Sequence, residues 1–417
     1  MMSMLVRKNP EWLSGLLKQN SFTHESYYKE IRHNHKPHGI CALAYLGFSE
    51  ERTRSYINEL NKHIPELKAD KPFTERALID YVKSVKLIDY RGKNNGFYAM
   101  KEKYEDLLKN KYNGDVIKMI KDVAPAIIDG PLYSAFHGII SIAYGYLGNS
   151  PETMLEGLIF MDQQYSPMLS DQPDHHKRKD LSNFGRGKTN ILDIFQKLHD
   201  NKELVKELKE EEEKDKEFRV DTHMAGVYGW PAPKYHGEYF LDMADDIQFP
   251  EWFDPEKEDL DQLFRVVDWF GDNAVVVYVK AETKNDFFLL HGITGSWSYR
   301  QICHLFDYKT ALRGLRALVA GLLAVYMTQQ APALSRSPEE FFEGEVNQAK
   351  WDAFMKELLE DETNYEMHAL KVIQCCYEFW LKRPEMGNYY YAAAVIAKRY
   401  FFSFGDEVTF PNNDLSA

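Results

Sequence analysis

Residues 135–161 read AFHGIISIAYGYLGNSPETMLEGLIFM, and this stretch decides the fold class. Apolar residues recur every three to four positions on both sides of the central GNSP, which is the pattern of two helices. Gly148 is expected to end the first helix, Ser150 to cap the second, and Pro151 to take its first position. The stretch therefore predicts a helical hairpin.

A second stretch, residues 41–60, has the same layout. CALAYLG is followed by Ser49, which can cap SEERTRSYINEL, and Glu50 and Glu51 fall in the first turn, where acidic side chains favour a helix. Elsewhere helical spacing also prevails, and alternating runs bounded by Asn-Gly or Asp-Gly turns are rare. We therefore predict a mainly α-helical protein, one large domain over residues 1–417 built from helical hairpins, with little or no β-structure.

The middle of the chain, residues 163–260, differs in composition and is predicted to be a polar, charged insertion within that domain. Residues 201–219 are almost wholly charged and favour a solvated helix. Residues 220–256 are rich in Trp, Pro and Gly, which predicts a long irregular loop over the body or the mouth of a pocket. Further on, AVVVYV at residues 274–279 has the length of a strand, but the apolar period before it favours a helix.

Composition limits the classes of function. The net charge of −13 argues against binding to nucleic acid or to an anionic membrane surface, so a small molecule is the expected partner. Four cysteines in 417 residues suggest no disulfide framework, and with no signal-like N-terminus we expect a cytoplasmic protein. The most apolar stretch, residues 317–327, is about half the ~20 residues that cross a bilayer, and it predicts a buried helix.

Three histidines fall within six positions in IRHNHKPHGICALAYLG, residues 31–47. His35 and His38 are three apart, so their rings can share a helical face if a helix begins near Pro37, and that geometry suits a metal ion. The alternative is that Pro37 starts the helix, Asn34 or His35 caps it, and the imidazoles are partly exposed.

Two more histidines lie in apolar surroundings. His137 is expected in the middle of a buried helix, where an unsatisfied imidazole would cost roughly 1 to 3 kcal/mol, so it needs a hydrogen-bond partner or a metal. Gly138 beside it would let another group approach closely. His291 precedes Gly292 and Gly295, and because glycine has no side chain, these positions would let a ligand approach the backbone closely. For both histidines, a hydrogen-bonded core residue is the alternative.

His368 and Lys371, in MHALKVIQCCYEF, are again three apart and share a helical face with an apolar stripe. Burial disfavours a charged amine and lowers its pKa, and a neutral amine can add CO2 to form a carbamate. The alternative is that Lys371 extends its ammonium group to water.

Nucleotide-binding and hydrolase motifs are absent from the sequence. FGRGKTN ends like a phosphate-binding loop, but the Walker pattern needs glycine where the chain has Ser182. No GxGxxG, GxSxG, CxxC or HExxH pattern is present.

Four motifs taken together, HNHKPHGICALAYLG, FHGIISIAYGY, LLHGITGSWSYR and MHALKVIQCCYEF, resemble the ordered motifs of the questin oxidase-like family. Members belong chiefly to fungal polyketide pathways, where they oxidatively open or rearrange anthraquinone rings. That reaction is described as an NADPH-dependent Baeyer–Villiger oxidation. The family also includes a non-haem iron dioxygenase whose iron is held by four histidines and a carboxylated lysine.

The resemblance implies an Fe(II) site with dioxygen as co-substrate and an aromatic small molecule as substrate. It implies one ligand from the first motif, His38 or His35, with His38 preferred because it lies inside the helix, and then His137, His291, His368 and carboxylated Lys371. The other histidine of the first motif would orient the ligand or contact substrate. Tyr144, Tyr299 and Arg300 are candidates for steering a phenolic oxygen.

Two other functions are compatible with the sequence. One is a metal-free, NADPH-dependent Baeyer–Villiger-type monooxygenase, and the other is a non-catalytic helical protein that binds a small molecule. The chain also departs from the family pattern, because Ser298, Tyr299 and Arg300 follow Trp297 where members often carry Ala-Leu-Arg. The resemblance therefore does not identify the substrate.

Overall fold

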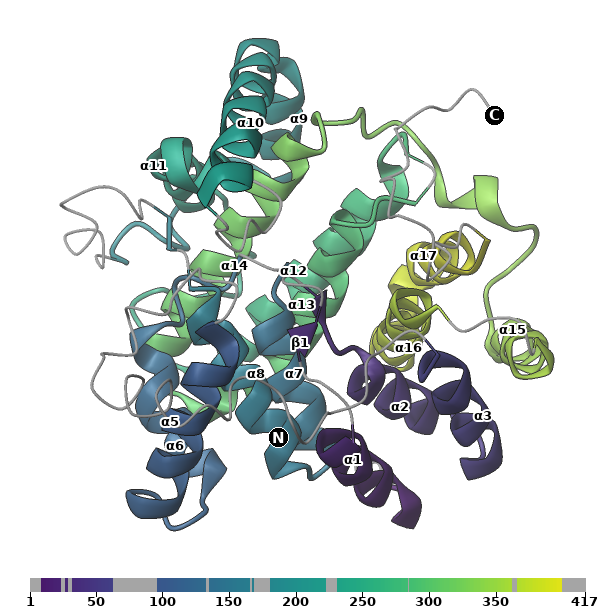
Figure 1. The fold of residues 1–417 in the computed structure, drawn as a ribbon. Coiled ribbons are helices and arrows are strands. Elements are labelled where there is room, and N and C mark those ends of the chain that lie inside the picture. The colour runs from purple at the N-terminus through teal and green to yellow at the C-terminus, as the bar shows by residue number, and fades with distance from the viewer. Residues whose placement is uncertain are drawn as a thin grey trace.

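The computed structural model describes residues 9–23, 27–28, 32–62, 96–132, 135–165, 167–168, 181–222, 231–283, 285–361 and 366–399. In these segments the fold is mainly helical, as predicted, and the β-structure is one antiparallel pair of two-residue strands (Figure 1). The elements are α1 Glu11–Thr23, β1 Tyr27–Tyr28, β2 Arg32–His33, α2 Lys36–Tyr45, α3 Glu50–Leu60, α5 Gly96–Asn110, α6 Val116–Val123, α7 His137–Leu147, α8 Pro151–Gln163, α9 Ile191–Asp200, α10 Lys202–Thr222, α11 Pro231–Asp245, α12 Leu260–Lys280, α13 Leu289–Ile302, α14 Tyr308–Thr328, α15 Gln348–Glu360, α16 Met367–Lys382 and α17 Gly387–Arg399, with short 3-10 turns at Ala124–Ala126, Cys303–Leu305, Pro338–Phe341 and Pro384–Met386.

Both predicted hairpins are present, as α2–α3 and α7–α8. Ser49 and Ser150 each accept a hydrogen bond from the backbone N–H three residues ahead, and Pro151 begins α8. Gly148 ends α7, but the left-handed residue of that turn is Asn149, with φ 53°. The local capping rules therefore place both turns correctly.

Close contact between α7 and α8 depends on glycine. A Cβ atom at Gly138 would lie 2.5 Å from the Cβ of Met161 and 2.7 Å from its Cα, and one at Gly157 would lie 2.7 Å from the backbone nitrogen of Ile142. The group that approaches Gly138 is thus the neighbouring helix.

Two later helices agree with the sequence-based interpretation. Residues 274–279 belong to α12, so the apolar period outweighs their strand-like length. By length and composition α14 could cross a membrane, but 94% of its apolar window is buried inside the protein. Such burial is typical of a core helix, which is what the sequence predicts for residues 317–327.

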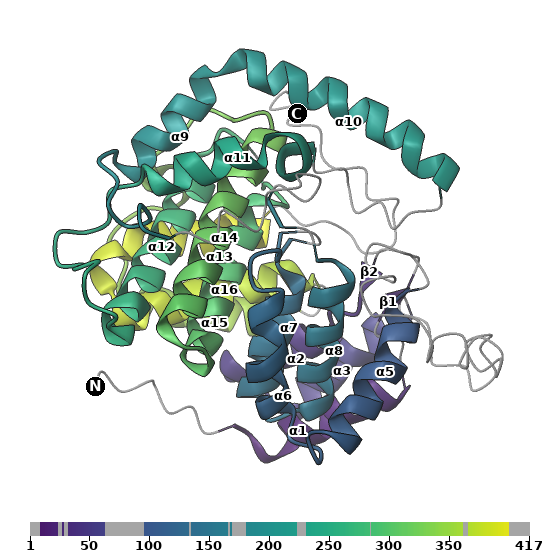
Figure 2. The ribbon, with the colours of Figure 1, turned by 90° about the vertical axis from the view of Figure 1, so that its left-hand side faces the viewer.

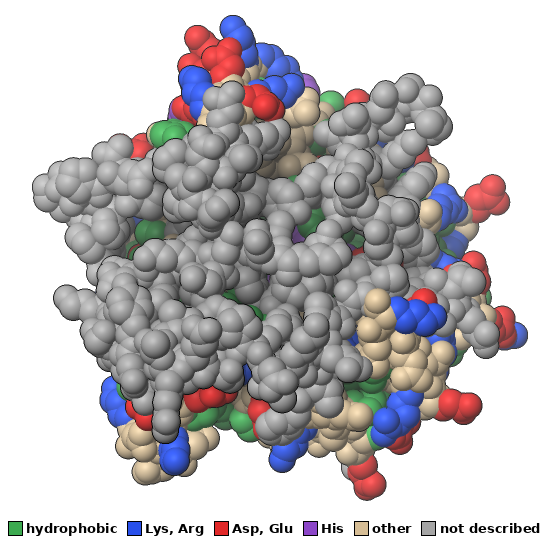
Figure 3. All heavy atoms as spheres, viewed as in Figure 1, with side chains coloured by type: hydrophobic (Ala, Val, Ile, Leu, Met, Phe, Trp, Pro, Cys, Tyr) green, Lys and Arg blue, Asp and Glu red, His purple; other side chains and the backbone are tan. Residues whose placement is uncertain are grey.

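The insertion contains more helix than the sequence suggested. The charged residues after 201 form α10, which crosses the outside of α11 (Figure 2) and carries mixed red and blue side chains at the upper end of Figure 3. The predicted loop over residues 220–256 is wrong in its centre, because Pro231–Asp245 is α11. Proline is tolerated in the first turn of a helix, where its missing N–H is not needed. Residues 223–230, and 169–180 earlier in the insertion, lie outside the described residues.

Four helices form a closed ring of contacts. α2 packs on α7, α7 on α13, α13 on α16, and α16 back on α2. Figure 1 shows these helices gathered at the middle of the molecule. Side chains at the facing ends of four such helices can meet at one point, as they do in metal sites inside helical bundles.

Candidate metal centre

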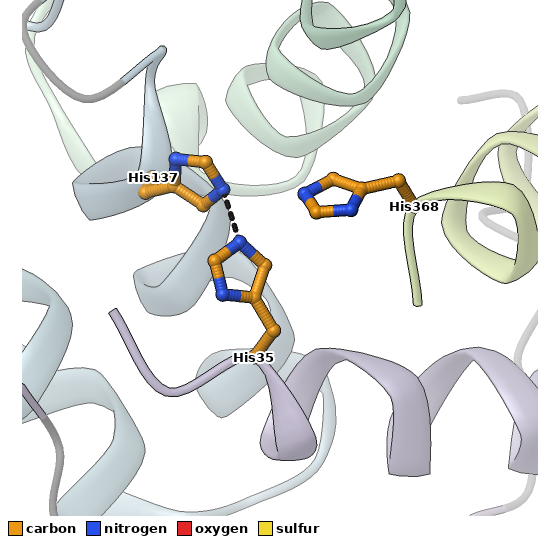
Figure 4. Close-up of side chains that lie close together, drawn as sticks. All are labelled: His35, His137 and His368. Atoms are coloured by element: carbon orange, nitrogen blue, oxygen red, sulfur yellow. Dashed lines mark hydrogen bonds between the residues drawn. The ribbon is translucent and has the colours of Figure 1, made fainter. Parts of the chain in front are cut away.

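Three imidazoles from separate helices converge (Figure 4). His35 is the residue before α2, His137 is the first residue of α7, and His368 is the second residue of α16. One potential ligand atom from each lies within 4.8 Å of the others, and all three residues are buried. The Nε2 atoms of His35 and His137 are only 2.6 Å apart, so a proton or a cation must lie between them, because two lone pairs would repel.

His291 of α13 adds a fourth ring. Its centroid lies 4.8 Å from that of His137 and 5.1 Å from that of His368, and the residue is fully buried. The Nε2 atoms of His291 and His368 have no hydrogen-bond partner among the described residues. α7, α13 and α16 thus each supply one imidazole, and the residue just before α2 supplies the fourth.

Hydrogen bonds on the far side of three rings fix their tautomers. The Nδ1–H of His35 donates to the carbonyl of His33 at 2.5 Å, and that of His291 donates to the carbonyl of Phe287 at 2.6 Å. In His368 the Nδ1–H donates to the carboxylate of Glu366 at 2.7 Å. A ring that donates through Nδ1 keeps its Nε2 lone pair for a metal, which is the usual arrangement around metal-binding histidines.

Lys371 stands one helical turn after His368 on the same face of α16, and it is fully buried. Its Nζ has no hydrogen-bond partner among the described residues. Burial lowers the pKa of Lys371 to about 7, although the nearby charge of Glu366 opposes the shift. The side chain therefore does not extend to water, and its amine is available in the neutral form near pH 7.

Burial also lowers the pKa of all four imidazoles, and the neighbouring rings or Lys371 lower it further. Each imidazole is therefore neutral near pH 7, the form that binds metals. Nitrogen ligands about 2.1 Å from one ion lie roughly 3 to 4 Å apart, which is between the 2.6 Å that separates the Nε2 atoms of His35 and His137 and the 4.8 Å within which the three potential ligand atoms lie. Imidazole nitrogen suits iron, zinc, copper or nickel, so the donor set fits a transition metal.

His38, the histidine preferred from the sequence, has a different environment. Its Nε2 lies 2.7 Å from the Oγ of Ser141, which also lies 3.3 Å from the Nε2 of His33. The rings of His33 and His38 are stacked 5.4 Å apart, and both are buried. The shared spacing of His35 and His38 did not distinguish them, but their hydrogen bonds favour His35 as the ligand.

The position of His137 depends on a strained turn. The sequence suggested a site in the middle of a helix, but α7 begins at His137, and the preceding residues Ala135 and Phe136 have φ values of 50° and 64°. The ring of Phe136 packs over Gly295 and Gly321, where a Cβ atom would approach it to 3.0 Å. Gly295 therefore makes room for the ring of Phe136, which holds the turn. The sequence had instead suggested that Gly295 makes room for a ligand. Such strain persists only where packing enforces it.

The polar groups of the three residues expected to steer substrate, Tyr144, Tyr299 and Arg300, bind other side chains or the backbone. The ring of Tyr144 stacks on His38 at 5.4 Å, and its hydroxyl donates to Gln374 at 2.7 Å. Tyr299 donates to the carbonyl of Ala311, and Arg300 pairs with Asp268. The last two follow His291 by eight and nine residues, about 12 Å along a helix, so the fold does not bring them to the imidazoles.

Three supporting residues were missed from the sequence. Glu366 could have been found as an acidic residue just before a helix that carries His368. Ser141 follows His137 by one turn, a spacing that places both on one face. Phe287 gave no local signal, yet its ring lies 5.0 Å from that of His291 and 4.7 Å from that of His368.

Comparison with known families gives one match. The model of the questin oxidase-like family matches residues 32–376 of the 417-residue chain, a span that includes every residue of the cluster. None of the curated proteins matches the chain. Because the match covers most of its length, the chain belongs to the questin oxidase-like family.

Proposed function

We propose that the chain is a non-haem iron-dependent oxygenase that uses dioxygen to oxidise an aromatic small molecule, by C–C cleavage or by Baeyer–Villiger-type insertion. The observation that carries the proposal is the convergence of four buried, neutral imidazoles beside the amine of Lys371. Family membership makes the chain an oxidoreductase with a small aromatic substrate. The metal and the type of reaction are our inference.

In this proposal His35, His137, His291 and His368 hold the ion as neutral ligands. The neutral Nζ of Lys371 adds to the carbon of CO2 and loses one proton, which gives a carbamate oxygen with one negative charge. A bound iron(II) supplies the one-electron chemistry through which dioxygen can react with a closed-shell phenol. The carboxylate of Glu366 and the carbonyls of His33 and Phe287 keep the three Nε2 lone pairs directed inward.

We infer that one aromatic residue contacts a flat substrate and that a second acts on it through His38. Phe287 is only partly buried and its ring borders both His291 and His368, so it can form one wall of the site. Tyr144 lies behind His38, and we retain it as a residue that orients substrate through that ring. Tyr299 and Arg300 are less suitable, because their polar groups bind other parts of the helices.

The test combines elemental analysis with isotope labelling. The protein is purified without oxygen, its iron content is measured, and it is then mixed with a panel of hydroxyanthraquinones under 18O2, with and without NADPH. An iron-dependent dioxygenase places two labelled oxygens in the product without NADPH. A monooxygenase places one, sends the other to water and consumes two electrons from a reductant.

The same experiment separates the alternatives. Activity that needs NADPH and survives removal of iron would favour the metal-free monooxygenase. Protein that binds these compounds without iron and without turnover would favour the binding protein. Either result would overturn the proposed function.

A further inference from the structure

The ring of His368 is supported differently from the other ligand rings. His35 and His291 donate to backbone carbonyls, which are neutral, whereas His368 donates to the carboxylate of Glu366. A carboxylate draws the Nδ1 proton more strongly than a carbonyl does, and this leaves more electron density on Nε2. The difference marks His368 as the strongest electron donor among these three rings.

Glu366 is held firmly in this role. Its second carboxylate oxygen accepts a hydrogen bond from the backbone N–H of Ala369 at 2.6 Å, so the residue is also the N-cap of α16. It is 7% exposed. Both of its carboxylate oxygens accept hydrogen bonds, one from the Nδ1–H of His368 and the other from the N–H of Ala369, which is the pattern of an ionised carboxylate.

We propose that Glu366 is a positioning residue that sets the reduction potential of the bound metal, through its charge and its hydrogen bond to His368. The inference rests on the proposed iron site. A fixed negative charge one imidazole away stabilises iron(III) more than iron(II), because the oxidised ion carries the larger positive charge. The carboxylate therefore lowers the potential and favours electron transfer from the iron.

Asp286 offers a matched control. It is likewise a buried carboxylate at the start of a ligand-bearing helix, and its Oδ1 accepts hydrogen bonds from the N–H groups of Phe288 and Leu289. No ligand ring donates to it among the described contacts. Glu366→Gln and Asp286→Asn each neutralise a buried carboxylate that accepts backbone hydrogen bonds near the start of a helix. Only Glu366→Gln also changes the contact with His368, so comparing the two variants isolates the effect of that contact.

The experiment is a redox titration of the iron-loaded protein, followed by the electron paramagnetic resonance signal of iron(III). Glu366→Gln is expected to raise the reduction potential of the iron by at least about 59 mV. For a one-electron couple this corresponds to a tenfold change in the ratio of iron(III) affinity to iron(II) affinity, in favour of iron(II). Glu366→Asp, which keeps the charge, should stay closer to wild type, and Asp286→Asn should shift far less than Glu366→Gln.

The outcomes distinguish this inference from the proposed function. If the wild-type protein takes up no iron, the proposed function fails and the inference fails with it. If the wild-type protein holds iron and Glu366→Gln leaves the potential unchanged, or Asp286→Asn shifts it equally, only the inference is overturned.

Discussion

His35 and His38 are three positions apart, yet they have different surroundings. His35 precedes the helix and its Nε2 faces His137, whereas His38 lies within the helix and its Nε2 faces Ser141. Within the family resemblance, His38 was preferred as the ligand because it lies inside the helix. The preference for His35 that we propose depends on contacts with α7, which no local pattern contains.

Substitution tests this difference at single residues. We expect His35→Ala to lose nearly all bound iron, because it removes one of the converging nitrogens. His38→Ala should retain most of the iron, because that ring binds Ser141. Iron per protein, measured after anaerobic loading and desalting, decides the point, and the reverse pattern would make His38 the ligand.

Ser141 supports the cluster from behind. Its Oγ lies between His38 and His33, and the carbonyl of His33 accepts the Nδ1–H of His35. We expect Ser141→Ala to weaken Zn²⁺ binding by about tenfold, the low end of the effect of losing a direct partner of a ligand, because Ser141 acts on His35 only through His33. Competition with a coloured chelator measures the affinity.

A second buried serine provides the control for that measurement. Ser298 is fully buried on α13, and its Oγ has no hydrogen-bond partner among the described residues. Ser298→Ala should leave Zn²⁺ affinity unchanged. Equal affinities for the wild type and Ser141→Ala would show that Ser141 has no supporting role.

Whole elements show which features local sequence rules can predict. Ser49 and Ser150 cap their helices as expected, because capping involves residues only three apart. The start of α7 at His137 was not predictable, because the left-handed Phe136 is held by packing over Gly295 and Gly321, more than 150 residues away in sequence. α11 was missed for a local reason, because its two prolines fall in its first turn, where a helix tolerates them.

The contact between α7 and α8 yields a prediction for stability. Gly138→Ala places a methyl group against the backbone of Met161, so we expect it to reduce the free energy of unfolding by about 2 kcal/mol or more. Gly15→Ala in α1 is the control, since nothing lies within 4 Å of its added Cβ and alanine favours helix. The free energies of unfolding of Gly138→Ala and Gly15→Ala are measured by urea unfolding. Equal values for the two variants would contradict the close packing of α7 on α8.

Asp286, which lies just before α13, yields a prediction about pH. Burial, opposed by hydrogen bonds from Leu289 and Phe288, raises the pKa of Asp286 from 3.8 to about 6. The folded state thus binds the proton more tightly, and the stability present at low pH is lost as pH rises through about 6. The Asp286→Asn variant has no such titrating group and does not lose this stability. The free energy of unfolding of the variant, minus that of the wild type, should therefore increase by about 1 kcal/mol between pH 5 and pH 8.

Urea unfolding of both proteins at the two pH values measures this change. The side-chain oxygen of asparagine can still accept the hydrogen bonds from Phe288 and Leu289, so a large loss of stability at pH 5 is not expected. A difference between variant and wild type that is the same at pH 5 and pH 8 would show that Asp286 does not titrate in this range.

At the scale of the whole molecule, the ring of α2, α7, α13 and α16 explains why the proposed ligands are so widely spaced in sequence. The cluster joins His35 to Lys371, and no two of its contributing helices adjoin in sequence. Histidines in apolar surroundings could be identified from the sequence. Their convergence could not be derived from spacing, because it depends on how the helices close around one point.

The most direct test is a crystal structure of the iron-loaded protein with anomalous diffraction at the iron absorption edge. We expect a single strong peak bonded to the Nε2 atoms of His35, His137, His291 and His368, with density for a carbamate on Lys371 reaching it. A peak elsewhere, or none between these four rings in protein that contains iron, would contradict the site.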